Sequence, residues 1–128
     1  MTSKEMGNIG ETAVCKYLIK KGYKIIERNF SYRGGEIDII AQDKSTIVFI
    51  EVKARKRDCM VSGVEAVNRS KKKKIIKTAA YYSYKKPLKL QPRFDIAEVI
   101  LEDEKAVAIR YYDEAFDMSG FDIMFSMA

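Results

Sequence analysis

Two apolar segments of this chain carry charged side chains at positions where a buried strand normally carries none. Asp38 lies within residues 35–41, and both Glu51 and Lys53 lie within residues 47–55. The segments have the length and apolar content of strands, and the short connection between them predicts a hairpin. An unpaired ion buried in a strand costs several kcal/mol. The three charges therefore require partners, and those partners restrict both the fold and the function.

The period of a strand and the length of the turn predict how these charges face one another. A two-residue turn at residues 44–45 places Asp38 opposite Glu51. The same register places Glu36 opposite Lys53. Cross-strand partners hold their Cβ atoms about 4.5–5.5 Å apart, and two carboxylates at about 5 Å repel by roughly 3 kcal/mol at an effective dielectric near 20. A β-bulge near these residues would shift the register by one.

A cation beside the two carboxylates explains this arrangement. A hard divalent ion such as Mg²⁺ or Mn²⁺ takes carboxylate and water oxygens and can activate water next to a reacting phosphate. Lys53 could then orient or deprotonate that water, or offset charge on the phosphate. The alternative is a set of structural contacts. In that case Lys53 pairs with Glu36 or Glu51, and Asp38 caps the backbone of residues 34–35.

The composition narrows the chemistry further. The chain of 128 residues contains no histidine, which excludes a Ser-His triad, a histidine base and histidine-ligated zinc. Its cysteines, Cys15 and Cys59, show no CxxC spacing, which indicates reduced thiols and a cytoplasmic location. No apolar run approaches the roughly 18 residues of a membrane span, and residues 1–5 show no apolar signal region. We expect a single globular domain without a membrane partner.

Positive charge is concentrated in the middle third of the chain. Residues 53–93 contain fourteen Lys and Arg against two acids, whereas the remainder contains ten against sixteen. This distribution favours a polyanionic partner, with nucleic acid as the first candidate. A solvated lysine-rich helix is the alternative that charge alone leaves open.

Apolar periodicity and turn residues predict an alternating series of elements. Helices are expected over residues 4–21 and 64–84, and an irregular basic loop over residues 55–63. Strands are expected over residues 23–30, 36–42, 46–53, 93–101 and 106–112. This order favours an α/β sandwich in which a mixed sheet packs between helices.

Asp38, followed thirteen residues later by Glu51-x-Lys53, resembles the PD-(D/E)xK nuclease superfamily, in which one acid precedes a D/E-x-K strand. More narrowly, the chain resembles the YraN-type family of Holliday-junction-resolvase-like endonucleases, from about residue 7 to residue 116. The motifs that carry the resemblance are Gly10-Glu11, Gly22-Tyr23, Asn29-Phe30, Gly35-Glu36-Ile37-Asp38, Phe49-Ile50-Glu51-Val52-Lys53-x-Arg55, Val64-x-Ala66-Val67, Arg93-Phe94-Asp95 and Ala115-Phe116.

The resemblance implies a restriction-endonuclease-like αβββαβ core with a mixed central sheet flanked by helices. It implies that Asp38, Glu51 and Glu11 ligate Mg²⁺ or Mn²⁺, with the Val52 carbonyl as a further ligand. Lys53 would be the catalytic lysine beside those three acids. Glu11 enters only through the resemblance, because its position alone indicates an exposed helix residue.

The basic segment would bind the DNA backbone without reading the base sequence. The candidate residues are Arg55, Arg69, Lys71, Lys72, Lys73, Lys74 and Lys77. For Arg55 and Arg93, pairing with Glu36 or Asp95 competes with phosphate contact.

The expected function is a divalent-metal-dependent DNA endonuclease that acts on branched or structured DNA in repair or recombination. Cutting both strands of a junction would need a homodimer, because one site makes one nick. The alternatives are a non-catalytic nucleic-acid-binding accessory protein with a nuclease fold, and a structural or interaction module whose acid-lysine set is an internal ion pair.

Residues 1–116 are expected to form the nuclease-like domain. Residues 117–128 are an apolar C-terminal extension outside the family pattern. We expect this extension to cover a sheet edge and to pack against a second subunit, with disorder as the alternative.

Overall fold

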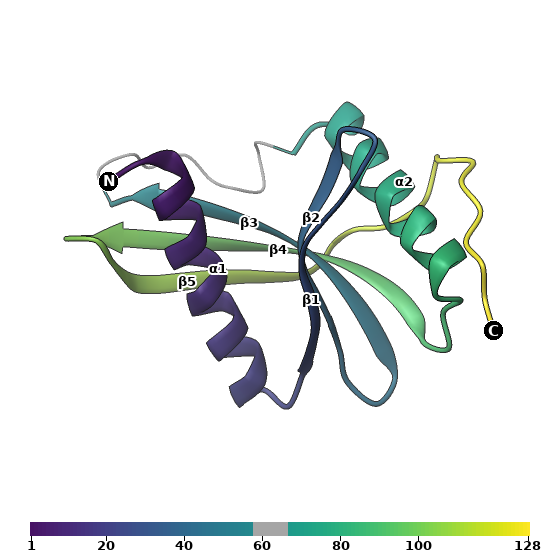
Figure 1. Ribbon diagram of the computed structural model, residues 1–128, viewed down its shortest axis with the longest axis horizontal. Helices are drawn as coiled ribbons and strands as arrows, with labels where there is room; N and C mark the ends of the chain where they lie inside the picture. The colour runs from purple at the N-terminus through teal and green to yellow at the C-terminus, as the bar shows by residue number, and fades with distance from the viewer. Residues whose placement is uncertain (58–66) are drawn as a thin grey trace.

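The computed structural model describes residues 1–57 and 67–128, and it consists of one five-stranded sheet and two helices (Figure 1). The elements in chain order are α1 (Ser3–Lys20), β1 (Lys24–Tyr32), β2 (Gly35–Gln42), β3 (Thr46–Lys56), α2 (Arg69–Lys85), β4 (Gln91–Glu102) and β5 (Lys105–Phe116). The strands lie side by side in the order β1-β2-β3-β4-β5. Only the β3–β4 pair is parallel. The predicted α/β fold class, a mixed sheet flanked by helices, is confirmed.

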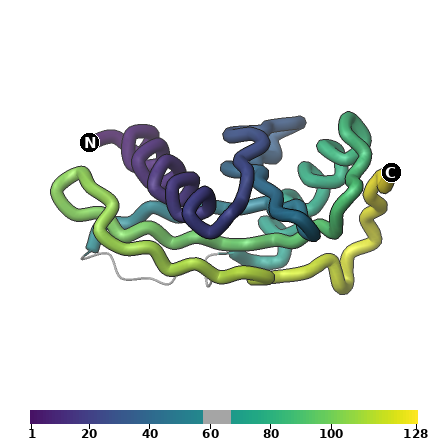
Figure 2. Tube along the Cα trace, turned by 90° about the horizontal axis from the view of Figure 1, so that it is seen from below, coloured from purple at the N-terminus to yellow at the C-terminus, as the bar shows by residue number. Residues whose placement is uncertain are grey.

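The sheet separates two apolar clusters, one under each helix. On β3, Val48 and Ile50 pack with the α1 cluster, whereas Ile47 and Phe49 pack with the α2 cluster. This alternation follows from the two-residue period of a strand. Figure 1 shows the β1–β2 hairpin between the two helices, and Figure 2 shows α1 lying over the long strands of the sheet. Strand β3 is therefore buried on both faces, as its near-continuous apolar sequence predicted.

Helix α1 begins and ends at clear local signals. Thr2 and Glu5 form a capping box at its start, which satisfies two backbone N–H groups. Gly22 follows its end with a φ of 94°, a conformation that glycine adopts without steric cost. Gly10 lets the helix approach β3 closely, because an added Cβ there would meet the Ala54 Cβ at 3.1 Å. The helix is thereby seated directly on the central strand.

Two predicted boundaries around the central loop were wrong. Strand β3 continues through Arg55 to Lys56, because its parallel ladder with β4 extends as far as the pair Lys56 and Leu101. Helix α2 begins at Arg69 rather than at residue 64, because Asn68 is its N-cap and accepts the backbone N–H of Lys71 at 2.9 Å. The predictions for residues 58–66, Cys59 among them, lie outside the described residues.

Strand β5 is longer than its apolar periodicity predicted, and the C-terminal tail packs beside α2. Strand β5 runs to Phe116 instead of ending at residue 112, and the Phe116 ring stacks on Phe94 across the sheet. Residues 117–128 then run alongside α2 (Figures 1 and 2). Leu88, after α2, donates its N–H to Ser126 O and accepts from Ala128 N–H. The tail is packed against the domain, and its pairing with a second subunit stays a prediction.

Two further findings concern the thiol of Cys15 and the length of the helices. Cys15 is a buried free thiol on the sheet-facing side of α1. In the part of the chain that the structure describes, neither helix is long and apolar enough to span a bilayer.

Candidate active site

The candidate site lies where β2 and β3 separate. Their antiparallel pairing runs from Gln42 and Ile47 to Ile39 and Ile50, in the register that the two-residue turn predicted. Beyond Ile39 the register departs from that expectation, so the predicted backbone pairings of residue 38 with 51 and of residue 36 with 53 do not form. Instead, the Asp38 Oδ2 atom accepts the Val52 N–H at 2.7 Å. A side chain thus takes the place of a ladder carbonyl at the point where the strands open.

The pairing of β2 with β1 is also irregular at this point. Asn29 on β1 lies between the paired residues Arg28 and Phe30 and has a left-handed φ of 54°. It therefore lies opposite Asp38, between the pairs that β1 makes with Ile39 and Ile37. Left-handed backbone interrupts a regular ladder, and asparagine tolerates it better than most residues. The Asn29-Phe30 motif thus marks the place where the regular β1–β2 pairing is interrupted at Asp38.

Asp38 is half-buried and surrounded by acids. Its pKa is raised to about 7, first by burial and then by the charge of Glu51, while the Val52 N–H opposes the shift. Glu11 and Glu36 raise this pKa further. Burial and like charges both favour the protonated carboxyl. A bound cation would reverse this effect, because it would stabilise the carboxylate.

Glu51 is contacted by two lysines from different elements. Its Oε1 atom lies 3.5 Å from Lys53 Nζ on the same strand and 3.2 Å from Lys71 Nζ on α2. The Lys53 contact fits one of the two structural pairings left open by the sequence. The Lys71 contact was missed, because nothing local in the sequence indicates that the first turn of α2 reaches β3.

The two lysines are shifted in opposite directions. Burial lowers the pKa of Lys53, and the adjacent Lys71 lowers it further, while Glu51 opposes the change. Burial also disfavours the charged form of Lys71, but its contacts with Lys53 and Glu51 outweigh that effect and raise its pKa. Lys53 is therefore the member of the pair that releases its proton more readily.

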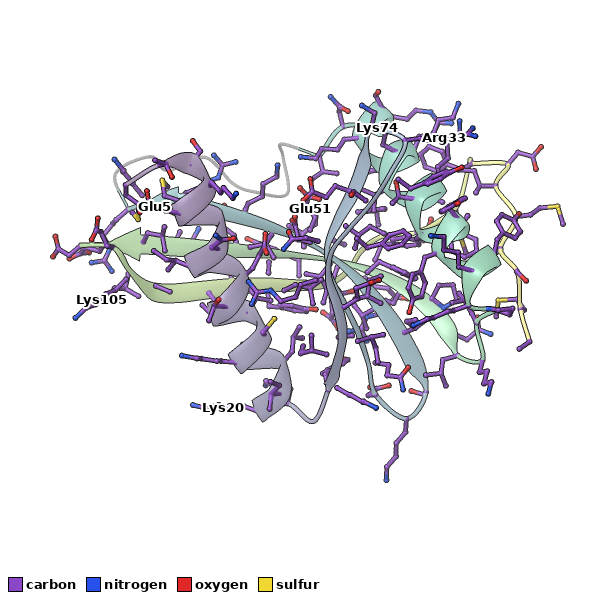
Figure 3. The ribbon with its side chains drawn as sticks, in the orientation of Figure 1. Glu5, Lys20, Arg33, Glu51, Lys74 and Lys105 are labelled. Carbon is purple, nitrogen blue, oxygen red and sulfur yellow. The ribbon has the colours of Figure 1, made fainter. Side chains whose placement is uncertain are left out.

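A groove of about 460 Å³ opens over these carboxylates between the β1–β2 hairpin and the start of α2. We call it the carboxylate groove, and it is lined by Gly34, Gly35, Glu36, Asp38, Glu51, Asn68, Ser70, Lys71, Lys74 and Ile75. Figure 3 shows Glu51 beside the hairpin and Lys74 at the nearby end of α2. Gly35 allows the close contact between hairpin and helix, because an added Cβ would overlap the Thr78 hydroxyl.

Glu11 is buried on α1, whereas position alone indicated an exposed residue. Its Oε1 atom lies 3.4 Å from Arg28 Nη2. It is near enough to Asp38 to raise the pKa of that carboxyl. This supports the place that the resemblance gives it near the site, but its role as a ligand stays a prediction.

The acids near the carboxylate groove are the candidate ligands for Mg²⁺ or Mn²⁺. Across residues 1–57 and 67–128, no three His, Cys, Asp or Glu side chains lie close enough together to hold a metal ion. Asp38 and Glu51 nevertheless line one groove, and their mutual repulsion raises the Asp38 pKa. A carboxylate pair whose remaining ligands are waters suits Mg²⁺, which usually keeps several waters. Asp38 and Glu51 fit such an ion, but the described structure does not bring the predicted set of Asp38, Glu51 and Glu11 together as a three-acid cluster. Ligation by Glu11 and by the Val52 carbonyl stays a prediction.

The predicted DNA-binding residues fall into separate environments. Lys73, Lys74 and Lys77 are exposed on α2. Lys72 is half-buried with its ammonium over the Phe116 ring. Arg69 donates to Gly120 O at 2.7 Å and lies over the Phe121 ring, so it anchors the tail.

The two arginines with open assignments both face acids of β4. Arg55 lies 3.7 Å from Glu98, a partner that the sequence did not suggest. Arg93 pairs with Asp95 through two hydrogen bonds of 2.9 and 2.8 Å, which agrees with one of the two pairings weighed for it. Arg93 thus belongs to a structural network on the α1 face rather than to the carboxylate groove.

Comparisons with known proteins agree with the family resemblance that the sequence motifs indicated. The model of the family described as "Uncharacterised protein family UPF0102" matches residues 10–99. The UPF0102 protein of Clostridium tetani is 45% identical over 118 residues, which cover 91% of this chain and 97% of the relative. A UPF0102 protein of Clostridium botulinum is 50% identical over 101 residues, which cover 77% and 82%.

A third relative, the UPF0102 protein of Caldanaerobacter subterraneus, is 47% identical over 106 residues, covering 82% of this chain and 87% of that protein. The family match spans the segment from Gly10 on α1 to Val99 on β4. Asp38, Glu51 and Lys53 all lie inside it. The chain therefore belongs to the UPF0102 family, the YraN-type group that its motifs resemble.

Proposed function

We propose that the protein is a divalent-metal-dependent DNA endonuclease that hydrolyses a phosphodiester bond in the carboxylate groove. The observation that carries the proposal is that Asp38 and Glu51 line one groove, where burial and the Glu51 charge raise the Asp38 pKa to about 7. A purely structural carboxylate is normally held by donors that lower its pKa. Here the strongest neighbour is another acid, so the arrangement is best relieved by a cation.

Residues that line the groove, together with Lys53 beside Glu51, would divide the work of hydrolysis. Asp38 and Glu51 would hold Mg²⁺ or Mn²⁺, and the Val52 N–H fixes the orientation of the Asp38 carboxylate. The bound ion would supply activation of a water and compensation of charge on the scissile phosphate. Lys53, whose pKa is lowered mainly by burial, would accept a proton from the attacking water or orient it.

The first turn of α2 supports a polyanionic substrate. It contains no acidic residue, although acids favour this end of a helix and cations oppose its dipole. Arg69, Lys71 and Lys72 lie in that turn instead, and Lys73 and Lys74 follow in the next turn. The N-terminus of a helix and a lysine cluster both attract phosphate. An arrangement that works against the stability of the isolated helix is consistent with selection for DNA binding.

Cleavage of labelled DNA tests the proposal. Purified protein is incubated with a four-way junction and with a matched linear duplex, in Mg²⁺, in Mn²⁺ or in EDTA. We expect nicks in the metal-containing reactions and none in EDTA. DNA binding without cleavage in every metal would favour the non-catalytic accessory protein.

A pair of lysine variants on β3 separates the catalytic role from general charge. Lys53→Ala is expected to reduce cleavage by at least about a hundredfold, the lower range for a group that transfers a proton. Its binding to DNA in EDTA should stay close to wild type. Lys56→Ala is the matched control, because Lys56 is an exposed lysine on the same strand. Equal cleavage by Lys53→Ala and wild type would remove Lys53 from the mechanism.

A further inference from the structure

A second groove adjoins the carboxylate groove, and half of its described lining residues are tyrosines and cations, with Asp122 as the one acid among them. Its volume is about 460 Å³, and it lies between the tip of the β1–β2 hairpin, α2 and the C-terminal tail. We call it the tyrosine groove. The lining residues that matter here are Tyr32, Arg33, Lys74, Lys77, Tyr81 and Tyr84.

Two of these tyrosines are already stacked. Tyr32 ends β1 and Tyr81 lies on α2, and their rings are nearly parallel, with an angle of 8° between the planes. Both side chains are half-buried rather than enclosed. Tyr84 is 59% exposed and is held by its hydroxyl, which donates to Met124 O at 2.8 Å. The groove thus presents aromatic surface in fixed orientations at the edge of the molecule.

Cations surround this aromatic surface. The Arg33 guanidinium lies 5.2 Å from the centroid of the Tyr32 ring, and the Lys85 ammonium lies 5.5 Å from that of Tyr81. Lys74 and Lys77 line the same groove and are exposed. Figure 3 shows Arg33 and Lys74 at the same end of the molecule, beside the hairpin tip. Aromatic faces next to basic side chains are typical of surfaces that bind unpaired nucleotides.

The two grooves are adjacent, because Gly35 and Lys74 line both. A strand whose phosphate lies in the carboxylate groove would therefore have a neighbouring nucleotide within reach of the tyrosines. A base in a duplex is stacked on both faces and cannot use them. An unpaired base can, and any of the four bases can stack because each has a π face.

We propose that the tyrosine groove binds an unpaired nucleotide of the DNA substrate, next to the bond that is cut. This inference rests on the proposed function, because it identifies the class of substrate that the same site takes. The tyrosines supply stacking without sequence preference, and the cations contact the flanking phosphates. The preferred substrate is then DNA that combines a duplex with an unpaired arm or gap.

Binding in EDTA tests this groove separately from catalysis. The probes are a fluorescent duplex and the same duplex carrying a short unpaired arm that contains 2-aminopurine. We expect the wild-type protein to bind the armed DNA about five- to a hundredfold more tightly, the range for stacking of one base. We also expect the 2-aminopurine emission to fall on binding, because stacking on a tyrosine quenches it.

Paired variants identify the ring as the cause. Tyr81→Leu should abolish the preference for the armed DNA, whereas Tyr81→Phe should keep it, because phenylalanine retains the stacking face. The thermal midpoint of each variant is measured to establish that it is folded. If Tyr81→Leu does not fold, the 2-aminopurine signal of wild type against Tyr84→Leu provides the same test.

Equal binding of both probes by wild type would overturn the proposal, and so would an unchanged preference in the folded Tyr81→Leu variant. Neither result depends on turnover. A protein that cleaves DNA but shows no preference loses this inference alone. A protein that prefers the armed DNA but never cleaves loses the proposed nuclease activity and keeps the binding site.

Discussion

Asp38 and Asp95 are both aspartates of the same sheet, yet their surroundings differ in kind. Asp95 is fully buried and receives hydrogen bonds from Arg93, from the Tyr111 hydroxyl at 2.6 Å and from the Glu114 N–H at 2.9 Å. Asp38 receives one hydrogen bond among the described residues, from the Val52 N–H.

The different surroundings of Asp95 and Asp38 also determine how the pKa values at each site are shifted. Around Asp95, a hydrogen bond to the carboxylate holds the pKa of Arg93 above its usual range, and burial beside the same acid raises the pKa of Tyr111. Around Asp38, the charges of Glu51, Glu11 and Glu36 raise its pKa, and the nearby cation is Lys71, whose charged form Asp38 favours. A carboxylate with a full set of donors stabilises the fold. A carboxylate among other acids is destabilised unless a cation compensates its charge, and for this reason we propose that Asp38 is the functional aspartate.

The largest expected effect is the loss of stability on removing Asp95 from its hydrogen-bond network. Asp95→Ala leaves the Arg93 charge without its buried partner, so we expect the free energy of unfolding to fall by about 3–5 kcal/mol. Denaturant unfolding monitored by circular dichroism measures it. The control is Glu102→Ala, which removes the exposed ion pair to Arg57 and should cost at most about 1 kcal/mol. Similar losses for the two variants would contradict the structural role of Asp95.

In metal-free buffer, replacing the Asp38 carboxylate is expected to increase stability, in contrast to replacing Asp95. The folded pKa of Asp38, about 7, lies above the unfolded value near 3.9, so the folded protein binds more protons between these limits. Stability contributed by this group is present at low pH and is lost as pH rises through 7.

Asp38→Asn removes this titration while keeping an oxygen for the Val52 N–H. We therefore expect the variant to become more stable than wild type as pH rises from 5 to 8, by a slope of at most about 1.4 kcal/mol per pH unit. Thermal unfolding in EDTA across this range measures the difference. Glu27→Gln, an exposed change on β1, is the control. Parallel curves for wild type and Asp38→Asn would show that Asp38 ionises normally.

Metal uptake should release protons from the Asp38 region. At pH 6 the Asp38 carboxyl is mostly protonated, and a carboxylate must lose its proton to bind a cation. Calorimetric titration with Mn²⁺ in two buffers of different ionisation enthalpy should give close to one proton released per ion at pH 6, and much less at pH 8. Equal proton release at both values would separate Asp38 from metal binding.

The smallest effect concerns the proposed DNA-binding surface of α2. Lys73→Gln on α2 should weaken duplex binding several-fold and reduce the salt slope by about one. Lys20→Gln changes an exposed lysine on α1 and should leave both unchanged. Fluorescence anisotropy over a range of salt concentrations provides the measurement. Equal losses in the two variants would show that DNA binding is spread over the surface rather than concentrated beside the carboxylate groove.

The local parts of this account could be predicted from the sequence. A turn length and a two-residue period were sufficient for the pairing of Ile39 with Ile50. They could not indicate that the β2–β3 ladder ends before Asp38, where the Asp38 side chain accepts the Val52 N–H. The contact of Lys71 with Glu51 also depends on tertiary packing. The extension of β3 through Arg55 was missed because its polar sequence is supported by the ladder with β4.

The most direct test of the central claim is the thermal midpoint as a function of Mn²⁺ concentration at pH 8. Binding to the folded state alone raises the midpoint as the ion concentration increases. The account predicts a rise for wild type that Asp38→Asn lacks and Glu27→Gln keeps. No rise in wild type, or an equal rise in Asp38→Asn, would contradict the claim that Asp38 and Glu51 bind a divalent cation.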